Sequence, residues 1–211
     1  MSARSDVVVV VTGDPSRTTG GFAYNRRVVE ALGQRAGISA SQLDISGVPF
    51  DAVSSQLGDS RIVFFDSIAF SEPVIVGVAE SLLKRPEPRP IVGALMHMLP
   101  SELAEKGDPS LLAATEQQLL PQSELVIAVS DYVAAKLDEA GARRERVFVI
   151  PPGRDGAGSA IPPVDSDGAK VRFVNVANWA PAKGIDLLLR AFARAEVDAT
   201  LDLVGWTQDR V

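Results

Sequence analysis

The sequence predicts an α/β protein built on a doubly wound parallel sheet. The first apolar run, Val7–Thr12, is unbroken and β-branched, as in a strand buried on both faces of a parallel sheet. Short apolar runs then alternate with amphipathic segments along the chain, which favours right-handed βαβ units. A stretch rich in proline and glycine interrupts this alternation at residues 151–169. We therefore expect one complete Rossmann-like domain, a linker and the opening of a second Rossmann-like domain.

The first domain is expected over residues 1–150. Its predicted strands are Val7–Thr12, Ser41–Ile45, Ile62–Phe65, Ile91–Met96, Leu125–Val129 and Val147–Ile150. Its predicted helices are Phe22–Arg35, Val74–Leu83, Ser101–Leu120 and Asp131–Ala140. Ser130 is a suitable N-cap for the last helix, and Gly141 a suitable stop. Such a sheet places ligands at the carboxyl ends of its strands, so the loops after these strands are the candidate site.

The second domain is expected to open at residue 170, after the linker. Eight of the nineteen linker residues are proline or glycine, a composition typical of a hinge. A strand at Val171–Val176, a helix at Lys183–Ala195 and a strand at Thr200–Val204 follow. The helix carries an apolar stripe at helical spacing, made of Ile185, Leu188, Leu189, Phe192 and Ala195. A lone βαβ unit buries little surface, so the sequence predicts that this domain continues past Val211.

Composition excludes several function classes. The net charge of −6 argues against nucleic-acid binding, which needs a basic face. Without cysteine there are no disulfides or thiolate metal sites, and one histidine leaves a metal site without visible partners. The longest apolar runs are too short for a signal peptide or a membrane span. Lys84, Arg85 and Arg89 form a basic cluster, but three neighbouring prolines make it a solvated loop. The sequence predicts a cytoplasmic protein that needs no metal or cofactor.

The loop after the first strand is a candidate ligand site. It ends in Gly20 and Gly21, which allow close backbone approach, and the helix start behind them offers free N–H groups to a phosphate or sugar hydroxyl. The spacing is not that of a dinucleotide fingerprint, so a plain dinucleotide-binding domain is disfavoured. A purely structural role for the glycines remains open. Tyr24 and Arg26 follow in the first turns of the helix, as ligand contacts or as surface residues.

Two further candidates follow other predicted strands. His97, the sole histidine, stands just past Ile91–Met96, where an α/β site would place a titratable group. It is either a site residue or a histidine hydrogen-bonded in a buried loop. Glu102, one turn into the next helix, could serve the site or favour the helix dipole. Asp66 is a strand-end carboxylate without a visible partner, and Ser130 is interpreted as a helix cap.

Lys183 is the strongest candidate in the second domain. The sequence places it at the first position of a helix, beside Gly184. A cation there opposes the positive end of the helix dipole unless an anion is bound, although the mismatch costs only about 0.3–1 kcal/mol. The pattern indicates an anion such as a phosphate.

Taken together, these segments resemble the retaining GT-B glycosyltransferases, glycosyltransferase family four. The resemblance rests on TGGFAYNRRVVEAL, PIVGALMHMLPSE, SELVIAVSDYVAAKLDEAG, RVFVIPPGRD and VNVANWAPAKGIDLLLRAF, which occur in the family's order across nearly the whole chain. These look like the glycine-rich first loop, the strand before the active-site histidine, a Ser-capped helix, the interdomain segment and the donor-domain opening.

The resemblance implies transfer of a sugar from a nucleotide-diphosphate donor to an unknown acceptor, with retention at the anomeric carbon and without metal. It implies that Gly20 and Gly21 approach the donor phosphate or the acceptor, that His97 contacts the transferring sugar and that Lys183 neutralises the leaving diphosphate. Asn178 stands where many members carry an arginine. The family's later pair of glutamates lies outside this chain, so the resemblance implies little activity for the 211 residues alone.

Other functions stay open at this point. The chain could be a non-catalytic half-transferase that pairs with a subunit supplying the donor site, or it could form a homo-oligomer. It could also be a sugar-nucleotide epimerase of GT-B type, which binds its substrate without an acceptor. A phosphorylase would need a cofactor lysine that the sequence does not display.

Overall fold

The structure, a computed structural model, describes residues 5–17, 19–103, 108–153 and 170–205. The chain divides into two compact units, Met1–Gly153 and Arg154–Val211. The first unit holds a six-stranded sheet and the second a two-stranded one. Residues 154–169, most of the expected linker, lie outside the described part of the chain.

The strands of the first unit are all parallel, in the spatial order β2-β1-β3-β4-β5-β6. They are β1 Val7–Val11, β2 Ala40–Asp44, β3 Ile62–Asp66, β4 Ile91–Met96, β5 Leu125–Ala128 and β6 Val147–Val149. The chain moves from β1 to β2 in one direction and from β3 onward in the other. The topological switch point, where such sheets bind ligands, therefore lies between the carboxyl ends of β1 and β3. The predicted doubly wound parallel sheet is confirmed.

Six helices accompany this sheet in the described residues, together with two short 3₁₀ turns. They are α1 Gly20–Gly33, α2 Phe50–Leu57, α3 Ile75–Leu83, α4 Pro100–Leu103, α5 Pro109–Gln122 and α6 Asp131–Glu139, with η1 Ser67–Ser71 and η2 Arg144–Arg146. Thr19 caps α1, and Ser130 caps α6 by accepting a hydrogen bond from Val133 N at 3.2 Å. Gly141 follows α6 with a φ of +87°, which explains the predicted stop.

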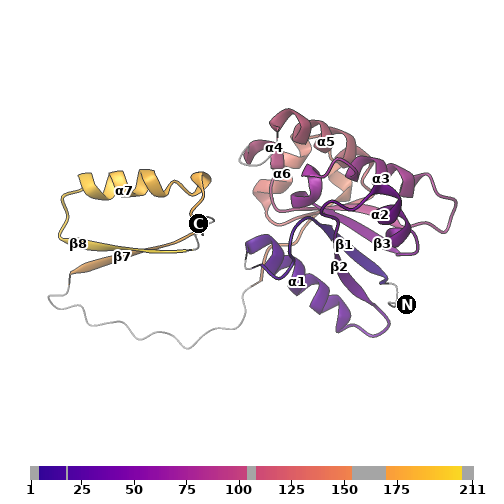
Figure 1. Cartoon of the computed structure of the whole chain (residues 1–211), viewed down its shortest axis with the longest axis horizontal. Helices are drawn as coiled ribbons and strands as arrows, with labels where there is room; N and C mark the ends of the chain where they lie inside the picture. The colour runs from indigo at the N-terminus through magenta and orange to yellow at the C-terminus, as the bar shows by residue number, and fades with distance from the viewer. Residues whose placement is uncertain (1–4, 18, 104–107, 154–169, 206–211) are drawn as a thin grey trace. The chain divides into compact units, whose positions relative to one another are not determined.

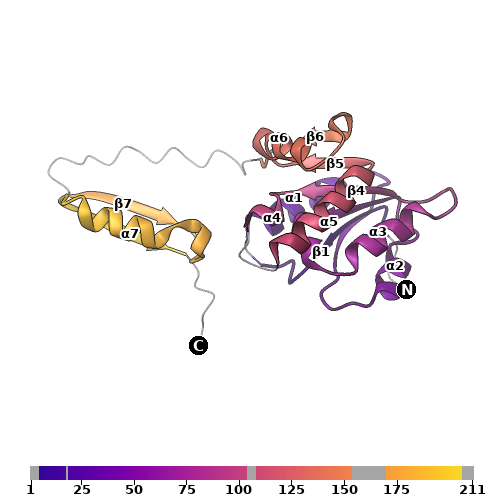
Figure 2. The same ribbon diagram turned by 90° about the horizontal axis from the view of Figure 1, so that it is seen from above.

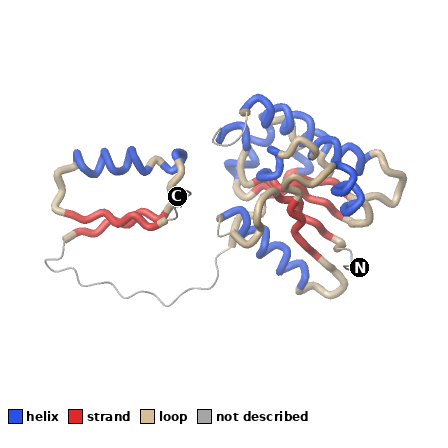
Figure 3. Tube along the Cα trace, viewed as in Figure 1, coloured by secondary structure: helices blue, strands red, loops and turns tan. Residues whose placement is uncertain are grey.

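Both faces of the sheet are buried, each in its own apolar cluster. Val7, Val9 and Val11 of β1 pack in the cluster beneath α1, whereas Val8 and Val10 belong to the larger cluster that includes residues of α2, α3, α5 and α6. Figures 1 and 3 show α1 on one side of the sheet and these other helices on the opposite side. Burial on both faces explains why the run Val7–Val11 is continuous rather than alternating. Each fully buried valine contributes about 1.5–3 kcal/mol.

Three elements of the first unit differ from the sequence prediction. The single helix expected at Ser101–Leu120 is two helices, α4 and α5, because Asp108 and Pro109 start a new one. Asp108 accepts a hydrogen bond from Ser110 N at 2.9 Å, and Pro109 occupies the first turn, where its missing N–H is not needed. The sequence prediction also missed α2 and η1. The N-cap of α2 is Pro49, whose side chain makes no capping hydrogen bond.

The second unit is a single βαβ unit. Strands β7 Val171–Val176 and β8 Ala199–Val204 pair in parallel, and α7 Ile185–Arg194 lies along one face of the pair (Figures 1 and 2). The Phe173 and Phe192 rings meet edge to face with centroids 6.0 Å apart. Ile185 is the one buried hydrophobic residue among those described in this unit. The predicted apolar stripe of α7 is present, but most of it is half-buried or exposed.

Lys183 is not the first residue of a helix, contrary to the sequence prediction. It ends a 3₁₀ turn, η3 Pro181–Lys183, and α7 begins at Ile185. Gly184 lies between the two as the N-cap, with a left-handed φ of +59° that an L side chain rarely adopts. The glycine thus ends the turn and redirects the chain into α7, and Lys183 precedes the helix N-terminus.

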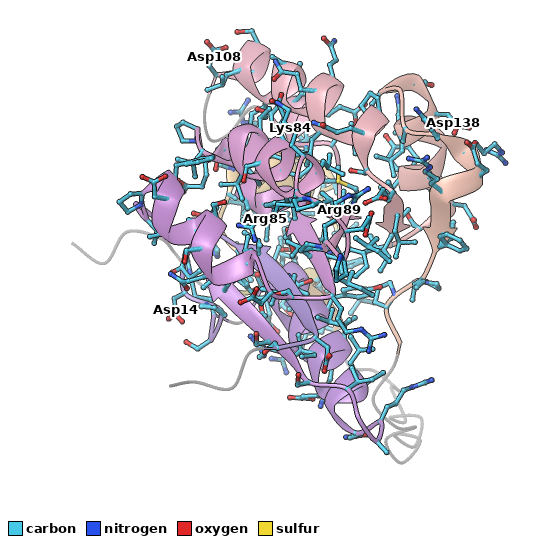
Figure 4. All side chains as sticks on the ribbon, turned by 90° about the vertical axis from the view of Figure 1, so that its right-hand side faces the viewer. Asp14, Lys84, Arg85, Arg89, Asp108 and Asp138 are labelled. Carbon is cyan, nitrogen blue, oxygen red and sulfur yellow. The ribbon has the colours of Figure 1, made fainter. Side chains whose placement is uncertain are left out.

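The basic cluster between α3 and β4 is a structural loop (Figure 4). Lys84 pairs with Glu80 on α3 at 2.9 Å, and Arg85 donates to the carbonyl oxygen of Ser54 at 3.0 Å. Arg89 makes a two-point contact with Glu124, at 2.8 and 3.1 Å. These contacts fix the loop against α2, α3 and the start of β5. No helix in the described part of the chain is long and apolar enough to span a membrane.

Candidate functional site

The candidate site lies at the carboxyl ends of β1, β3 and β4, beside the switch point of the sheet. The loop and helix after β1 supply Gly21, Tyr24 and Asn25. The end of β3 supplies Asp66, and His97 follows β4 directly. Because parallel strands end at the same edge of a sheet, residues distant in sequence meet here. Figure 1 shows the start of α1 against this edge.

A buried carboxylate holds the imidazole of His97. His97 Nε2 lies 3.1 Å from Asp66 Oδ2, and the side chains of His97 and Asp66 are 8% and 0% exposed. Asp66 Oδ1 accepts a hydrogen bond from Ile68 N at 2.7 Å, at the start of η1. Ser67 Oγ accepts one from His97 N at 3.2 Å. The ring and the backbone of His97 are therefore both fixed by the segment that follows β3.

Asn25 completes the buried cluster from α1. Its Nδ2 donates a short hydrogen bond to Asp66 Oδ2, and its Oδ1 lies 3.2 Å from His97 Nε2. Asn25 is fully buried, a position that a neutral amide occupies only when its polar atoms are partnered. One asparagine thus connects the carboxylate and the imidazole.

Tyr24 packs against the ring of His97. The two rings meet edge to face, with centroids 5.4 Å apart and planes at 87°. The Tyr24 hydroxyl donates to the carbonyl oxygen of Ile150 at 2.8 Å, just past β6. Burial raises the pKa of this hydroxyl, which keeps it a donor. Tyr24 is buried against His97, so the alternative that it is a surface residue is wrong, whereas its role as an acceptor-side contact stays a prediction.

The two glycines at the start of α1 have different surroundings. A Cβ at Gly21 would lie 3.1 Å from Ile68 Cδ1 and 3.3 Å from His97 Cδ2, so Gly21 gives the imidazole its space. A Cβ at Gly20 would meet nothing within 4 Å. Gly20 is exposed and leaves the backbone open to a ligand, as a phosphate or sugar contact requires.

In the described part of the chain, Arg26 and Glu102 make their hydrogen bonds and ion pairs with residues other than His97. Arg26 Nη1 donates to the carbonyl oxygens of Pro15 and Arg17, at 2.7 and 3.0 Å, and so holds the loop after β1. Glu102 is paired with Lys136 of α6 at 3.3 Å and lines a crevice of about 470 Å³ between α4, α5 and α6. The structure does not bring Glu102 to the imidazole.

Asn178 and Lys183 belong to the second unit, and both are exposed. They follow the carboxyl end of β7, Asn178 in the loop and Lys183 at the end of η3. Among the residues described here, Lys183 has no ion-pair partner. A free cation at a strand end, just before a helix N-terminus, suits an anion.

The comparisons with known proteins find similarity to solved structures only. No family model and no curated protein matches the chain. Among solved structures, the apo form of the lipopolysaccharide outer core galactosyltransferase WaaB is similar, with a TM-score of 0.67 and 11% identity. The match covers 96% of this chain and 61% of that one. The likeness is one of fold. The chain has a Rossmann-like α/β fold similar to that of this galactosyltransferase, and it spans about 61% of the galactosyltransferase's length.

Sequence reasoning missed Asn25 and left Asp66 without a partner. Asn25 lies four residues after Gly21, so the two share the face of α1 that meets His97. A polar residue on the inward face of an amphipathic helix, opposite a strand-end carboxylate, is the signal that could have found the cluster. No group of three or more potential metal ligands occurs in the described residues, and the prediction that no metal is needed stays a prediction.

Proposed function

We propose that the chain is the acceptor-side domain and the opening of the donor domain of a retaining glycosyltransferase. It would transfer a sugar from a nucleotide-diphosphate donor to an acceptor, in the cytoplasm and without a metal. The observation that carries this proposal is the buried cluster of Asp66, Asn25 and His97 at the switch point, in a fold similar to that of a galactosyltransferase.

The roles follow from where each residue lies in its unit. His97 contacts the transferring sugar, because its ring is held in place at the carboxyl end of β4. Gly20 leaves room for a phosphate or hydroxyl against bare backbone. Lys183, with Asn178, stabilises the negative charge that develops on the leaving diphosphate.

Donor binding tests the role of Lys183. We would titrate the 211-residue chain with UDP-, ADP- and GDP-sugars by calorimetry and compare Lys183→Ala with Lys170→Ala. Lys170 is a matched control, since it lies in the same unit and is paired with Asp198 at 2.5 Å. Loss of the Lys183 charge should weaken binding about tenfold or more, as expected for a charge-assisted contact. Equal effects of both variants would remove Lys183 from the donor site.

Sugar transfer tests the function itself. The protein is incubated with the labelled donor that binds and with lipid and glycan extracts as acceptors, and NMR reads the configuration of the product. Transfer with retention, reduced at least about tenfold by His97→Ala, supports the proposal. Donor binding by the chain with transfer that requires a separate second protein would favour the half-transferase. Interconversion of the donor without an acceptor would identify an epimerase.

A further inference from the structure

The hydrogen bonds around His97 define which ring nitrogen carries the proton. Two oxygen atoms face Nε2, namely Asp66 Oδ2 at 3.1 Å and Asn25 Oδ1 at 3.2 Å. A carboxylate oxygen and an amide oxygen are acceptors, so a hydrogen on Nε2 satisfies both, whereas a bare Nε2 would leave three acceptors facing one another. The proton of a neutral imidazole therefore belongs on Nε2.

The orientation of Asn25 is itself determined by Asp66. A carboxylate accepts hydrogen bonds and does not donate them, so the amide group of Asn25 must turn its Nδ2 toward Asp66 Oδ2 and its Oδ1 toward the ring. Asp66 thus specifies both oxygens that Nε2 meets. The other carboxylate oxygen is already occupied by the backbone N–H of Ile68, which prevents the group from rotating.

The second ring nitrogen of His97 is left for a ligand. His97 Nδ1 has no hydrogen-bond partner among the residues described. Gln42 Oε1 is the one fully buried polar side-chain atom without a partner in that part of the chain, so His97 Nδ1 is not completely buried. With the proton on Nε2, Nδ1 carries a lone pair and accepts a hydrogen bond.

We propose that Asp66 is a positioning residue that acts through Asn25 to keep the His97 proton on Nε2, so that Nδ1 meets the substrate as a hydrogen-bond acceptor. The group that binds there is a hydrogen-bond donor, namely a hydroxyl of the sugar or the acceptor. This last step rests on the proposed function, whereas the assignment of the proton does not. A phosphate oxygen, which lacks a hydrogen to donate at neutral pH, is excluded from Nδ1.

The sole histidine makes the proposal directly testable. Long-range ¹H–¹⁵N correlation spectra of the imidazole distinguish the two neutral tautomers, and every imidazole signal of the chain belongs to His97. In the unmodified 211-residue chain at about pH 8, where an ordinary imidazole is neutral, we expect the Nε2–H form. The Nδ1–H form, or a ring with both nitrogens protonated, would overturn the proposal.

The variant Asp66→Asn should replace the hydrogen-bond acceptors around His97 Nε2 with donors. Its amide would keep an oxygen toward Ile68 N and turn an NH₂ group toward Nε2 and Asn25, whose own amide then flips. Both neighbours of Nε2 become hydrogen-bond donors, so the ring proton should move to Nδ1. Replacement of the orienting aspartate by asparagine has the same effect on the histidine tautomer in Ser-His-Asp triads. Asp44→Asn is the matched control, because Asp44 also ends a strand but bonds to Gly13 N and Ser46. Its spectrum should remain that of the Nε2–H form.

An unchanged tautomer in a folded Asp66→Asn protein would refute the role of Asp66. If that variant does not fold, the spectrum of the unmodified chain still decides where the proton lies. Once transfer is established, Asp66→Asn should lower turnover about tenfold or more in the unmodified enzyme and cause no further loss in His97→Ala. An equal loss in both backgrounds would mean that Asp66 acts on structure alone. Because the spectra need no substrate, failure of the proposed function and failure of this assignment are distinguishable.

Discussion

The orientation of the His97 side chain is set by residues that lie far from it in the sequence. Its ring is bounded by a carboxylate, an amide and an aromatic edge, and its backbone N–H is held by Ser67. Sequence reasoning placed the imidazole at the end of a strand, since the strand pattern and the parallel topology determine that edge. It could not identify the partners, because Asn25 and Asp66 are separated by 41 residues and meet only when α1 packs on the sheet.

Replacement of Gly21 by alanine should disturb the imidazole, whereas replacement of Gly20 should not. A methyl group at Gly21 would lie 3.1 Å from Ile68 Cδ1 and 3.3 Å from His97 Cδ2, so the neighbours must move by a few tenths of an ångström. We expect Gly21→Ala to shift the His97 NMR signals and to lower the free energy of unfolding by about 1–3 kcal/mol. Gly20→Ala, which meets nothing within 4 Å, is the control. Equal shifts in both variants would contradict this account.

At the scale of elements, prediction succeeded where periodicity and caps agree. The strand Val7–Val11 was located because a short, continuous β-branched run indicates a buried strand. Helix α6 was located because Ser130 is a typical N-cap. The division between α4 and α5 was missed because a helical pattern continues across Asp108 and Pro109, and only their capping contacts reveal the restart. The start of α7 was placed two residues early because the left-handed φ of Gly184 cannot be inferred from periodicity.

The loop between α3 and β4 is joined to β5 by an ion pair that should make stability depend on pH. The hydrogen bonds from Arg89 hold the pKa of Glu124 below its usual value, despite the opposing effect of burial. A carboxyl with a depressed folded pKa stabilises the protein above its unfolded pKa of about 4.3, and this contribution is lost as the pH falls through the folded pKa.

Glu124→Gln should therefore lower the free energy of unfolding by about 1 kcal/mol at neutral pH, since the pair is partly exposed. The difference between variant and unmodified protein should diminish as the pH falls and vanish once the pH lies below the folded pKa of Glu124. Glu87→Gln is the control, because the Glu87 side chain is 76% exposed and its 3.4 Å contact with Arg89 is well solvated. Denaturant titrations across pH measure both. A difference that persists in acid would assign the effect to packing.

At the scale of the whole molecule, the two units differ in how much of their apolar surface they bury. The first unit contains two extensive apolar clusters, one on each face of its sheet. In the second, Val176 of β7 is 75% exposed and Val204 of β8 is 53% exposed, on neighbouring strands. Composition could not reveal this contrast, because both units are rich in apolar residues. They differ in the number of helices and strands that pack together to bury those residues.

Residues 1–153 should fold without the rest of the chain. We expect this segment alone to unfold in one cooperative thermal transition and to keep the His97 signals of the full chain, because Asp66, Asn25 and Tyr24, which contact His97, all lie within it. The segment 154–211 alone should lack a cooperative transition, since its described part has a single buried hydrophobic residue. Circular dichroism on heating measures both. A cooperative transition in the short segment would show that it has a hydrophobic core, contrary to the exposed fractions of its side chains.

The hydrogen bond between Tyr24 and Ile150 has a mechanical consequence. Ile150 directly follows β6, and the chain leaves the first unit within a few residues of it. A pull on the chain beyond Ile150 would strain the Tyr24 hydroxyl, and the Tyr24 ring stands edge to face with His97 at 5.4 Å. A displacement of Ile150 would thus reach the imidazole through two contacts. The orientation of the Tyr24 ring would therefore report at the candidate site on the position of the chain just after β6.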